Sequence, residues 1–399
     1  MPKFRTLDDI AVRGKRVLLR ADLNVPIKNG VVTDTTRIER LAPTIDALLG
    51  RGAKVIVISH FGRPKGKRDP ALSLRPLIAP LSRAIGDRDV IFAEDCVGDE
   101  AKRVISALRP GQVALLENLR FHKEEEANSP DFAGALAELG EVYVYDAFSA
   151  AHPAHASIDA LARLLPNAAG KLMQAELTAL TAALETPRRL VLALIGGAKV
   201  STKLDLLRYL IGKVDILVVA GVMANTFLFA EGREIGRSLC ERDMADSARE
   251  TLIVAHRRNC HVVLPEDVVV AATLDPEVAS RTVGIEVVPS DMMILDVGPL
   301  TVTRIAALLE EASTLIWNGP HGAFETPPFD RGTVALAKNI GELTRAGKLL
   351  SVAGGGDTVA ALDAARVSDE LSYVSTAGGA FLEWLEGREL PGVTALCSG

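Results

Sequence analysis

The sequence lacks the features that mark several large classes of protein. Its cysteines are few and widely spaced, with no CxxC pair, which offers neither a zinc site nor a disulfide framework; they are Cys96, Cys240, Cys260 and Cys397. Apolar runs are no longer than a strand, so we expect no membrane span. The N-terminus has no apolar signal core, and we therefore expect a cytoplasmic protein with reduced thiols.

Several binding motifs are also missing. The formal net charge is -6, which argues against a nucleic-acid partner because such binding rests on a basic face. No GxxxxGK[ST] occurs, which excludes a P-loop NTPase, and the absence of GxGxxG weakens a dinucleotide-binding interpretation. No fixed-period repeat or low-complexity tract is present. The arginines are therefore better explained as local binding groups for a small anion.

What is present is a regular alternation of short apolar strands and helical patterns over 399 residues. This predicts the α/β class, with two doubly wound parallel-sheet domains joined by a linking helix at 171–184. The helix lies between Gly170 and Pro187, both typical of helix boundaries. The strands are expected at Val17–Arg20, Val55–Ile58, Val90–Phe92, Val113–Leu116, Val142–Tyr145, Val191–Ile195, Ile216–Val219, Val262–Leu264, Met293–Leu295, Leu315–Trp317 and Leu349–Val352.

Two glycine-rich turns in the second half each stand between a strand and a helix. The first, GGGDT, ends in Asp357 and Thr358; its glycines allow close approach of a phosphate, and Asp357 fits either a Mg²⁺ ligand or a helix N-cap. The second, IGGAKVSTK, carries Lys199 and Lys203, whose spacing on a helix would place both ammonium groups on one face. A solvated lysine face is the alternative.

Cationic and polar residues follow three strands of the first half. Asp22 and Asn24 follow one strand, with Arg37 at the start of the next helix. His60 and Arg63 follow a second strand, and Arg120 follows a third. Ligands of open α/β sheets lie beyond the carboxyl ends of strands, and arginine binds phosphate or carboxylate as a two-pronged donor. Single arginines usually form surface ion pairs, but three at successive strand ends favour a small phosphorylated acid.

Two further segments are open to more than one interpretation. In WNGPHGAFE, Asn318 and Glu325 fit either a ribose site or a simple capped turn. His152 and His155 have no serine or cysteine nucleophile arranged around them, and we assign them to loop or domain contacts.

Taken together, these segments resemble phosphoglycerate kinase. The motifs occur in that family's order and cover essentially the whole chain: RADLNVP, TTRIE, SHFGRPKG, ENLRF, DAFSAAHPAHAS, GGAKVSTK, WNGPHGAFE, GGGDT, STAGGAFLE and LPGVTAL. The resemblance implies an acid-substrate domain at 1–170, to which 390–399 returns, and a nucleotide-binding domain at 171–389 that includes the linking helix.

The resemblance also implies a reaction and a set of partners. It implies a glycolytic kinase, a phosphotransferase with a carboxyl group as acceptor, that moves a phosphoryl group reversibly from 1,3-bisphosphoglycerate to ADP with Mg²⁺. The products are 3-phosphoglycerate and ATP, and the enzyme is expected to be a cytoplasmic monomer that works by domain closure. The alternative is a nucleotide-binding paralogue with weakened phosphoglycerate binding and a regulatory role.

Site residues follow from the same resemblance. The acid substrate is expected at Asp22, Asn24, Arg37, His60, Arg63 and Arg120. The nucleotide is expected at Lys203, Asn318, Glu325, Gly355, Gly356, Asp357 and Thr358. The catalytic groups are expected to be Arg37, Lys199, Lys203 and Gly356, and the metal ligand Asp357.

The chain departs from the family pattern at several positions. Pro153 stands where an arginine that grips the acid's phosphate is expected. The remaining departures replace asparagine, leucine, two glycines near the adenine site, methionine, glycine and serine; in that order they are Tyr145, Phe61, Ala220, Val222, His321, Ala377 and Phe381.

Overall fold

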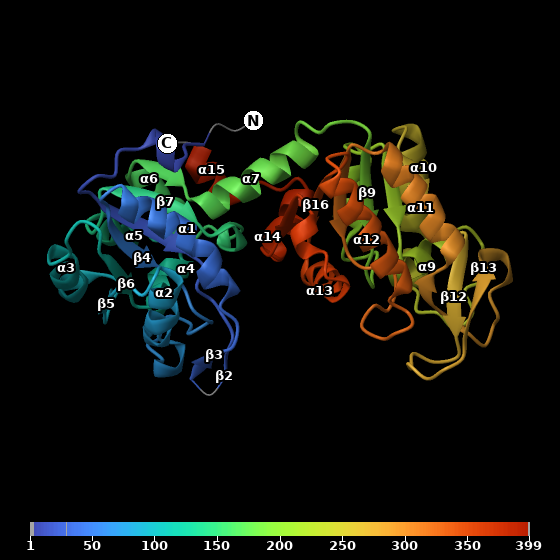
Figure 1. Ribbon diagram of the computed structural model, residues 1–399, viewed down its shortest axis with the longest axis horizontal. Coiled ribbons are helices and arrows are strands. Elements are labelled where there is room, and N and C mark those ends of the chain that lie inside the picture. The colour runs from blue at the N-terminus through green and yellow to red at the C-terminus, as the bar shows by residue number, and fades with distance from the viewer. Residues whose placement is uncertain (1–3, 29, 398–399) are drawn as a thin grey trace. The chain divides into compact units, whose positions relative to one another are not determined.

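The computed structural model describes residues 4–28 and 30–397, which form two compact units. One unit runs up to Leu177 and resumes at Glu389; the other runs from Thr178 to Arg388. Each contains a six-stranded sheet whose paired strands are all parallel. The expected α/β class with two doubly wound parallel sheets is therefore confirmed (Figure 1).

The sheet of the first unit has the strand order β5-β6-β4-β1-β7-β8. Its strands are β1 (Arg16–Ala21), β4 (Lys54–Ile58), β5 (Val90–Ala93), β6 (Val113–Leu116), β7 (Val142–Asp146) and β8 (Asn167–Ala169), with a small hairpin of β2 (Ile27–Lys28) and β3 (Val31–Val32). The helices are α1 (Thr36–Gly50), α2 (Ile78–Ala84), α3 (Gly98–Ser106), α4 (Lys123–Glu126), α5 (Pro130–Ala137), α6 (Leu161–Leu164) and α15 (Pro391–Cys397).

Side-chain alternation explains why this sheet is covered on both faces. Val17 and Leu19 of β1 belong to one core cluster with Ile38 and Ile45 of α1, whereas Leu18 points to the opposite face and is also fully buried. A parallel strand that is buried on both faces needs a continuous apolar run, which β1 and β4 provide.

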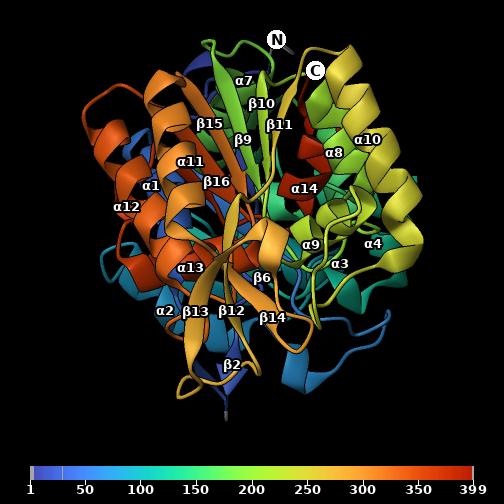
Figure 2. The same ribbon diagram turned by 90° about the vertical axis from the view of Figure 1, so that its right-hand side faces the viewer.

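The sheet of the second unit has the order β11-β10-β9-β15-β16-β17. Helices α11 and α12 lie on one side of it, and α8 and α10 on the other (Figure 2). The strands are β9 (Val191–Ile195), β10 (Ile216–Val219), β11 (His261–Val263), β15 (Thr314–Asn318), β16 (Leu350–Gly354) and β17 (Tyr373–Ser375). The helices are α8 (Leu204–Ile211), α9 (Gly221–Ala230), α10 (Ala245–Arg257), α11 (Pro299–Glu311), α12 (Arg331–Arg345), α13 (Gly356–Ala365) and α14 (Gly379–Leu385).

One expected strand belongs elsewhere. The strand at Met293–Leu295 is present within β14 (Met293–Val297), but it pairs antiparallel with β12 (Asp267–Ala271), which also pairs with β13 (Ser280–Gly284). These three strands form a separate small sheet, packed through Val268 and Val270 against α9. Inclusion of Met293–Leu295 in the parallel series was wrong, because strand partners depend on distant segments that periodicity does not reveal.

The helix expected at 171–184 is present as α7 (Lys171–Leu184). The two units meet in sequence within this helix, between Leu177 and Thr178. The chain also returns to the first unit, where the backbone N–H of Gly392 donates to the carbonyl of Ala151 at 3.0 Å. Residues 398–399 of the expected returning segment lie outside the described residues. Within the described part, no helix is long and apolar enough to cross a membrane.

Candidate active site

Three adjacent strands of the first sheet bring the expected acid-binding residues to one edge. Asp22 and Asn24 follow β1, His60 and Arg63 follow β4, and Arg120 lies in a single 3-10 turn after β6. Strands β6, β4, β1 and β7 are neighbours in the sheet and run parallel, so their carboxyl ends lie side by side. This is the edge where open α/β sheets bind ligands.

Direct contacts connect most of these residues. The Arg37 Nη1 donates to Asp22 Oδ2 at 2.6 Å and to the carbonyl of Asn24 at 3.2 Å. The Asn24 Oδ1 accepts from the backbone N–H of Gly62 at 3.0 Å, and Arg120 Nη1 donates to the carbonyl of Gly62 at 2.9 Å. The loops after β1, β4 and β6 are therefore joined into one network. Arg63 is exposed and close enough to Arg120 for their charges to interact.

His60 is neutral and accepts a hydrogen bond from Arg20 beside this network. Burial and the neighbouring Arg20 guanidinium lower its pKa to about 3. Its Nδ1 lies 3.2 Å from Arg20 Nη2, which can only donate, so Nδ1 accepts and the proton is on Nε2. A neutral imidazole with Nε2–H can donate to a carboxylate or phosphate oxygen without adding charge.

The structure adds three residues that the sequence interpretation did not place in this site. Arg20 is buried and donates to Ser157 Oγ at 2.8 Å. Ser149, in a 3-10 turn after β7, donates its hydroxyl to Asp22 Oδ2. His155 lies close enough to Arg120, Arg20 and His60 for their charges to interact. The assignment of His155 to a loop contact was therefore incomplete, since applying the strand-end rule to β7 would have drawn attention to it and to Ser149.

Asp22 is held as a carboxylate although its side chain is only 9% exposed. Burial by itself would raise its pKa, but the Arg37 guanidinium, the Ser149 hydroxyl and the Asn24 N–H together lower it. Pro153 lies nearby in sequence and supplies no charge; its carbonyl accepts the N–H of His155 at 3.0 Å. The net result is an edge with cations at positions 37, 63 and 120.

The second sheet has a comparable edge at the carboxyl ends of β9, β15 and β16. Asn318, at the end of β15, is buried and uses both ends of its amide. Its Nδ2 donates to the carbonyl of Gly354 at 2.8 Å, and its Oδ1 accepts from Lys203 Nζ at 2.7 Å. Lys203 also donates to the carbonyl of Gly196. Burial lowers the pKa of Lys203 to about 8, opposed by the Asp357 charge.

The sequence pattern would place Lys199 and Lys203 on one face of a helix, but both precede the first residue of α8. Residues 201–203 form turns, and α8 begins at Leu204 with Lys203 as its N-cap. Lys199 is exposed, whereas Lys203 is half-buried. The expected helical register was wrong, because residues 196–203 form loop and turns and the helix begins only at Leu204.

In the GGGDT segment, the alternative interpretation of Asp357 as a helix N-cap is wrong. Gly355, with φ of +99°, is the N-cap of α13, so Asp357 is not a cap. Among the described residues, no hydrogen bond uses the Asp357 carboxylate, which is exposed in the first turn of α13. Thr358 is buried, and its Oγ1 accepts from the N–H of Gly319 at 2.7 Å. Thr358 thus fixes the turn after β15.

The donor set at this edge fits a magnesium ion. Mg²⁺ prefers carboxylate oxygens and usually retains several waters together with substrate phosphates. Asp357 offers a solvent-exposed carboxylate beside the open space at Gly356, where an added Cβ would meet nothing within 4 Å. Glu325 is exposed in the segment between β15 and α12, with no hydrogen bond to another described residue.

Three departures near this edge can be located. Ala220 is buried as the N-cap of α9, and Val222 is half-buried in its first turn. Phe381 is fully buried beneath Gly354, where an added Cβ would lie 2.7 Å from the ring. The larger side chain at 381 therefore makes glycine obligatory at 354.

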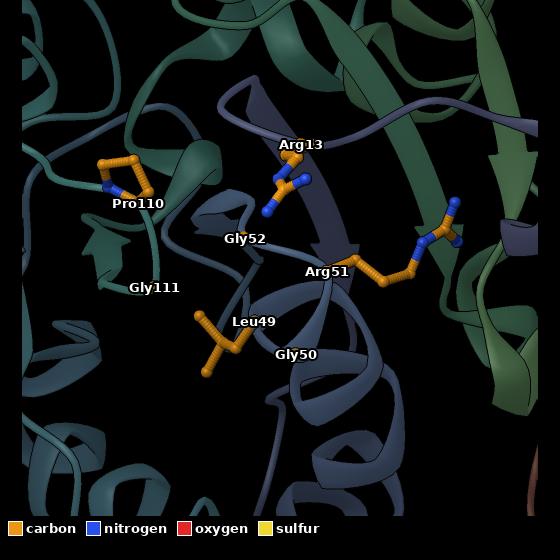
Figure 3. A pocket seen from close by; sticks show the side chains of 7 residues that line it. All are labelled: Arg13, Leu49, Gly50, Arg51, Gly52, Pro110 and Gly111. Carbon is orange, nitrogen blue, oxygen red and sulfur yellow. The ribbon is translucent and has the colours of Figure 1, made fainter.

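A hollow and a side-chain cluster lie away from these two edges in the described part of the chain. A hollow of about 490 Å³ lies at the amino ends of the first sheet, between Gly52 and Gly111 (Figure 3). Its Arg51 points away and donates to the carbonyl of Ile10 at 2.5 Å.

Asp95, Cys96 and His122 form the other notable cluster, with ligand atoms within 4.8 Å of one another. However, Asp95 Oδ1 and His122 Nε2 bond directly to each other at 2.7 Å. Burial, with the nearby carboxylates, raises the pKa of the Cys96 thiol well above its usual value, which keeps the thiol protonated.

Comparison with known proteins identifies the family of this chain. A family model described as phosphoglycerate kinase matches residues 7–388. The chain belongs to the phosphoglycerate kinase family. It is 59% identical over 397 residues to the phosphoglycerate kinase of Methylorubrum extorquens strain PA1, covering 99% of both chains. It is 58% identical to that of Rhizobium leguminosarum bv. trifolii, again with 99% coverage of both.

Solved structures of the phosphoglycerate kinase family have the same fold. The enzyme from Coxiella burnetii superposes with a TM-score of 0.92 at 42% identity and 99% coverage of both chains. The enzyme from Pyrococcus horikoshii gives 0.81 at 30% identity, covering 99% of this chain and 98% of that one. The family assignment makes this chain a phosphoryl-transferring enzyme, and nothing in these comparisons favours the non-catalytic paralogue.

Proposed function

We propose that this phosphoglycerate kinase binds its acid at the carboxyl edge of the first sheet and its nucleotide, with Mg²⁺, at that of the second. The reaction is reversible transfer of a phosphoryl group from 1,3-bisphosphoglycerate to ADP, giving 3-phosphoglycerate and ATP. The observation that carries the acid assignment is the network that joins Asp22, Asn24, Arg37 and Arg120 across three strand-end loops.

Each acid-site group has a chemical part in this proposal. The arginines at 37, 63 and 120 bind the phosphate and carboxylate, because guanidinium groups match both in shape and charge. His60 donates through Nε2–H, while Asp22 and Asn24 accept from the acid's hydroxyl. Pro153 leaves the phosphate without the fourth cation that the family pattern would supply there.

The nucleotide groups complete the proposal. Asp357 holds Mg²⁺, Glu325 accepts from the ribose, and Asn318, Gly355 and Thr358 shape the phosphate site. Held by Asp357, the ion would supply positive charge that offsets the negative charge of the phosphates. Lys203, Lys199 and Arg37 stabilise the charge of the transferred group, while the N–H of Gly356 at the start of α13 donates to phosphate oxygens.

The proposal includes a cytoplasmic monomer whose units close about α7 during turnover. Closure would exclude water, which otherwise hydrolyses an acyl phosphate. The net charge of -6 supports small-molecule substrates without a nucleic-acid partner.

The test is a coupled assay of ATP formation from 1,3-bisphosphoglycerate with Asp357→Asn. We expect turnover to fall by roughly 100-fold or more, because the amide cannot replace a charged metal ligand. Asp363→Asn is the matched control, since Asp363 is on the same helix and its carboxylate, among the described residues, accepts only from the Ser368 hydroxyl. Near-normal turnover of Asp357→Asn at limiting Mg²⁺ would show that Asp357 is not a magnesium ligand.

A further inference from the structure

Ser149 connects the loop after β7 to the acid edge, which is the proposed acid site at the carboxyl ends of β1, β4 and β6. It lies in the 3-10 turn Phe148–Ala150, four residues before Pro153, and its hydroxyl donates to Asp22 Oδ2. That same oxygen accepts from Arg37 Nη1 at 2.6 Å. The Asp22 carboxylate thus receives donors from two elements far apart in sequence, α1 and the segment after β7.

The remaining contacts of Asp22 show how few groups hold its orientation. Its Oδ1 accepts from the N–H of Asn24 at 3.0 Å, a contact within the same loop. Arg37 is 38% exposed and is a long, mobile side chain, so it cannot fix the carboxylate by itself. Ser149 is short and is attached to a turn that β7 and the C-terminal helix support.

We propose that Ser149 is a positioning residue for the acid substrate, holding Asp22 so that Asp22 in turn directs the Arg37 guanidinium. This role rests on the acid site proposed above. It acts through Asp22 and needs no contact between Ser149 and the acid. A serine hydroxyl suits it because it can rotate to donate while occupying little space at the edge.

The position of Ser149 also affects the loop that follows β7. The segment that follows contains Pro153 and His155, and His155 lies close to His60 and Arg120. The Ser149–Asp22 bond therefore fixes the loop after β7 against the loop after β1. Its loss should disturb the acid edge and leave the β9, β15 and β16 edge unchanged.

The experiment compares Ser149→Ala, Ser149→Thr and Ser73→Ala in the full chain. Ser73 is the matched control, because its Oγ donates to the buried Glu117 carboxylate at 2.6 Å in the same unit. For each variant the Kd for 3-phosphoglycerate and for Mg-ATP would be measured by calorimetric titration, and kcat and KM in the direction of ATP consumption. Circular dichroism and the Tm would check folding.

We expect Ser149→Ala to raise the Kd for 3-phosphoglycerate about three- to tenfold and to leave the Kd for Mg-ATP unchanged, in line with loss of one modest hydrogen bond. Ser149→Thr, which keeps a hydroxyl, should restore the acid affinity. Ser73→Ala should leave it unchanged.

Two results would overturn the inference. Equal acid affinity in Ser149→Ala and the parent, with only a lower Tm, would make the hydroxyl a purely structural contact. Equal weakening by Ser73→Ala would make the effect a general loosening of the unit. Arg37→Ala serves as the reference arm: if it binds and turns over the acid normally, the proposed acid site itself is wrong, whereas an impaired Arg37→Ala beside a normal Ser149→Ala rejects only the role of Ser149.

Discussion

At the scale of single residues, three histidines are kept neutral by their surroundings. Burial is the main cause that lowers the pKa of His60 to about 3, of His155 to about 4 and of His321 to about 4. For His60 and His155, nearby arginines add to the effect. At the carboxyl ends of β1, β4 and β6, where the acid site is proposed, positive charge is thus carried by guanidinium groups. These keep their protons throughout the physiological range.

His321 differs because its ring contacts the Trp317 ring but has no polar partner among the described residues. It is 1% exposed, and neither ring nitrogen has a hydrogen-bond partner among the described residues. The pKa is lowered in the folded protein, so the unfolded chain binds more protons between pH 6.5 and about 4. Stability therefore falls as the pH is lowered through that window.

We predict that His321→Met, which places the family's usual residue there, stabilises the protein by about 1–3 kcal/mol at pH 7, since it removes buried polar atoms without partners. The advantage should grow by up to about 1.4 kcal/mol per pH unit as the pH falls from 6.5 towards 4. Urea unfolding at several pH values would measure it.

The difference between variant and parent is the relevant quantity in this experiment. Burial raises the pKa of Asp296 to about 7, which changes stability in the opposite direction over a similar range but does so in both proteins. The exposed His256→Gln serves as the control and should show no such difference. A His321→Met protein that is no more stable at any pH would mean that the imidazole has found a partner.

At the scale of elements, strand-to-helix turns set the geometry at the carboxyl ends of β9, β15 and β16, where the nucleotide site is proposed. The turn between β16 and α13 places Gly355 at φ +99°, against the Asn318 amide. An added Cβ would lie 2.6 Å from Asn318 Nδ2. Since Asn318 Oδ1 holds Lys203, the absence of a side chain at position 355 helps to place the lysine.

We predict that Gly355→Ala weakens ATP binding about tenfold or more, because displacement of Asn318 releases Lys203 and a hydrogen bond to a charged group is worth about 1.5–3 kcal/mol. Gly347→Ala is the control: Gly347 also has a positive φ, +69°, but a Cβ there would meet nothing within 4 Å. Calorimetric titration with ATP would compare them. Equal losses would show that backbone strain, rather than contact with Asn318, is responsible.

At the scale of the whole molecule, the chain begins and ends in the same unit. Helix α15 packs against the first unit through Val393 and Leu396, and its Gly392 lies where a Cβ would be 2.6 Å from the Tyr145 ring. The last segment therefore completes the core beside β7. The first unit cannot reach its full stability until the second has been synthesised.

We predict that Leu396→Ala destabilises the first unit by about 2–5 kcal/mol, the usual cost of truncating a fully buried leucine. Hydrogen exchange should show lower protection of β1 and β4, with β9 and β15 unchanged. Thr394→Ala, on the exposed side of the same helix, should change stability by less than about 0.5 kcal/mol. Loss of protection in both sheets alike would contradict this localisation.

The sequence by itself determined the elements and the chemistry at the strand ends. Apolar runs placed β1, β4, β6, β9 and β15 nearly at their observed bounds, because a strand buried on both faces must be continuously apolar. Strand-end loops rich in arginine or glycine then marked both candidate edges, because parallel sheets bind ligands there.

Only the tertiary structure decided partners and local register. It placed β14 in a separate antiparallel sheet, made Gly355 rather than Asp357 the N-cap of α13, and put Lys203 at a helix start instead of along its face. It also brought Ser149 to Asp22, residues separated by 127 positions. These facts depend on contacts between segments distant in sequence, which local periodicity and propensity do not encode.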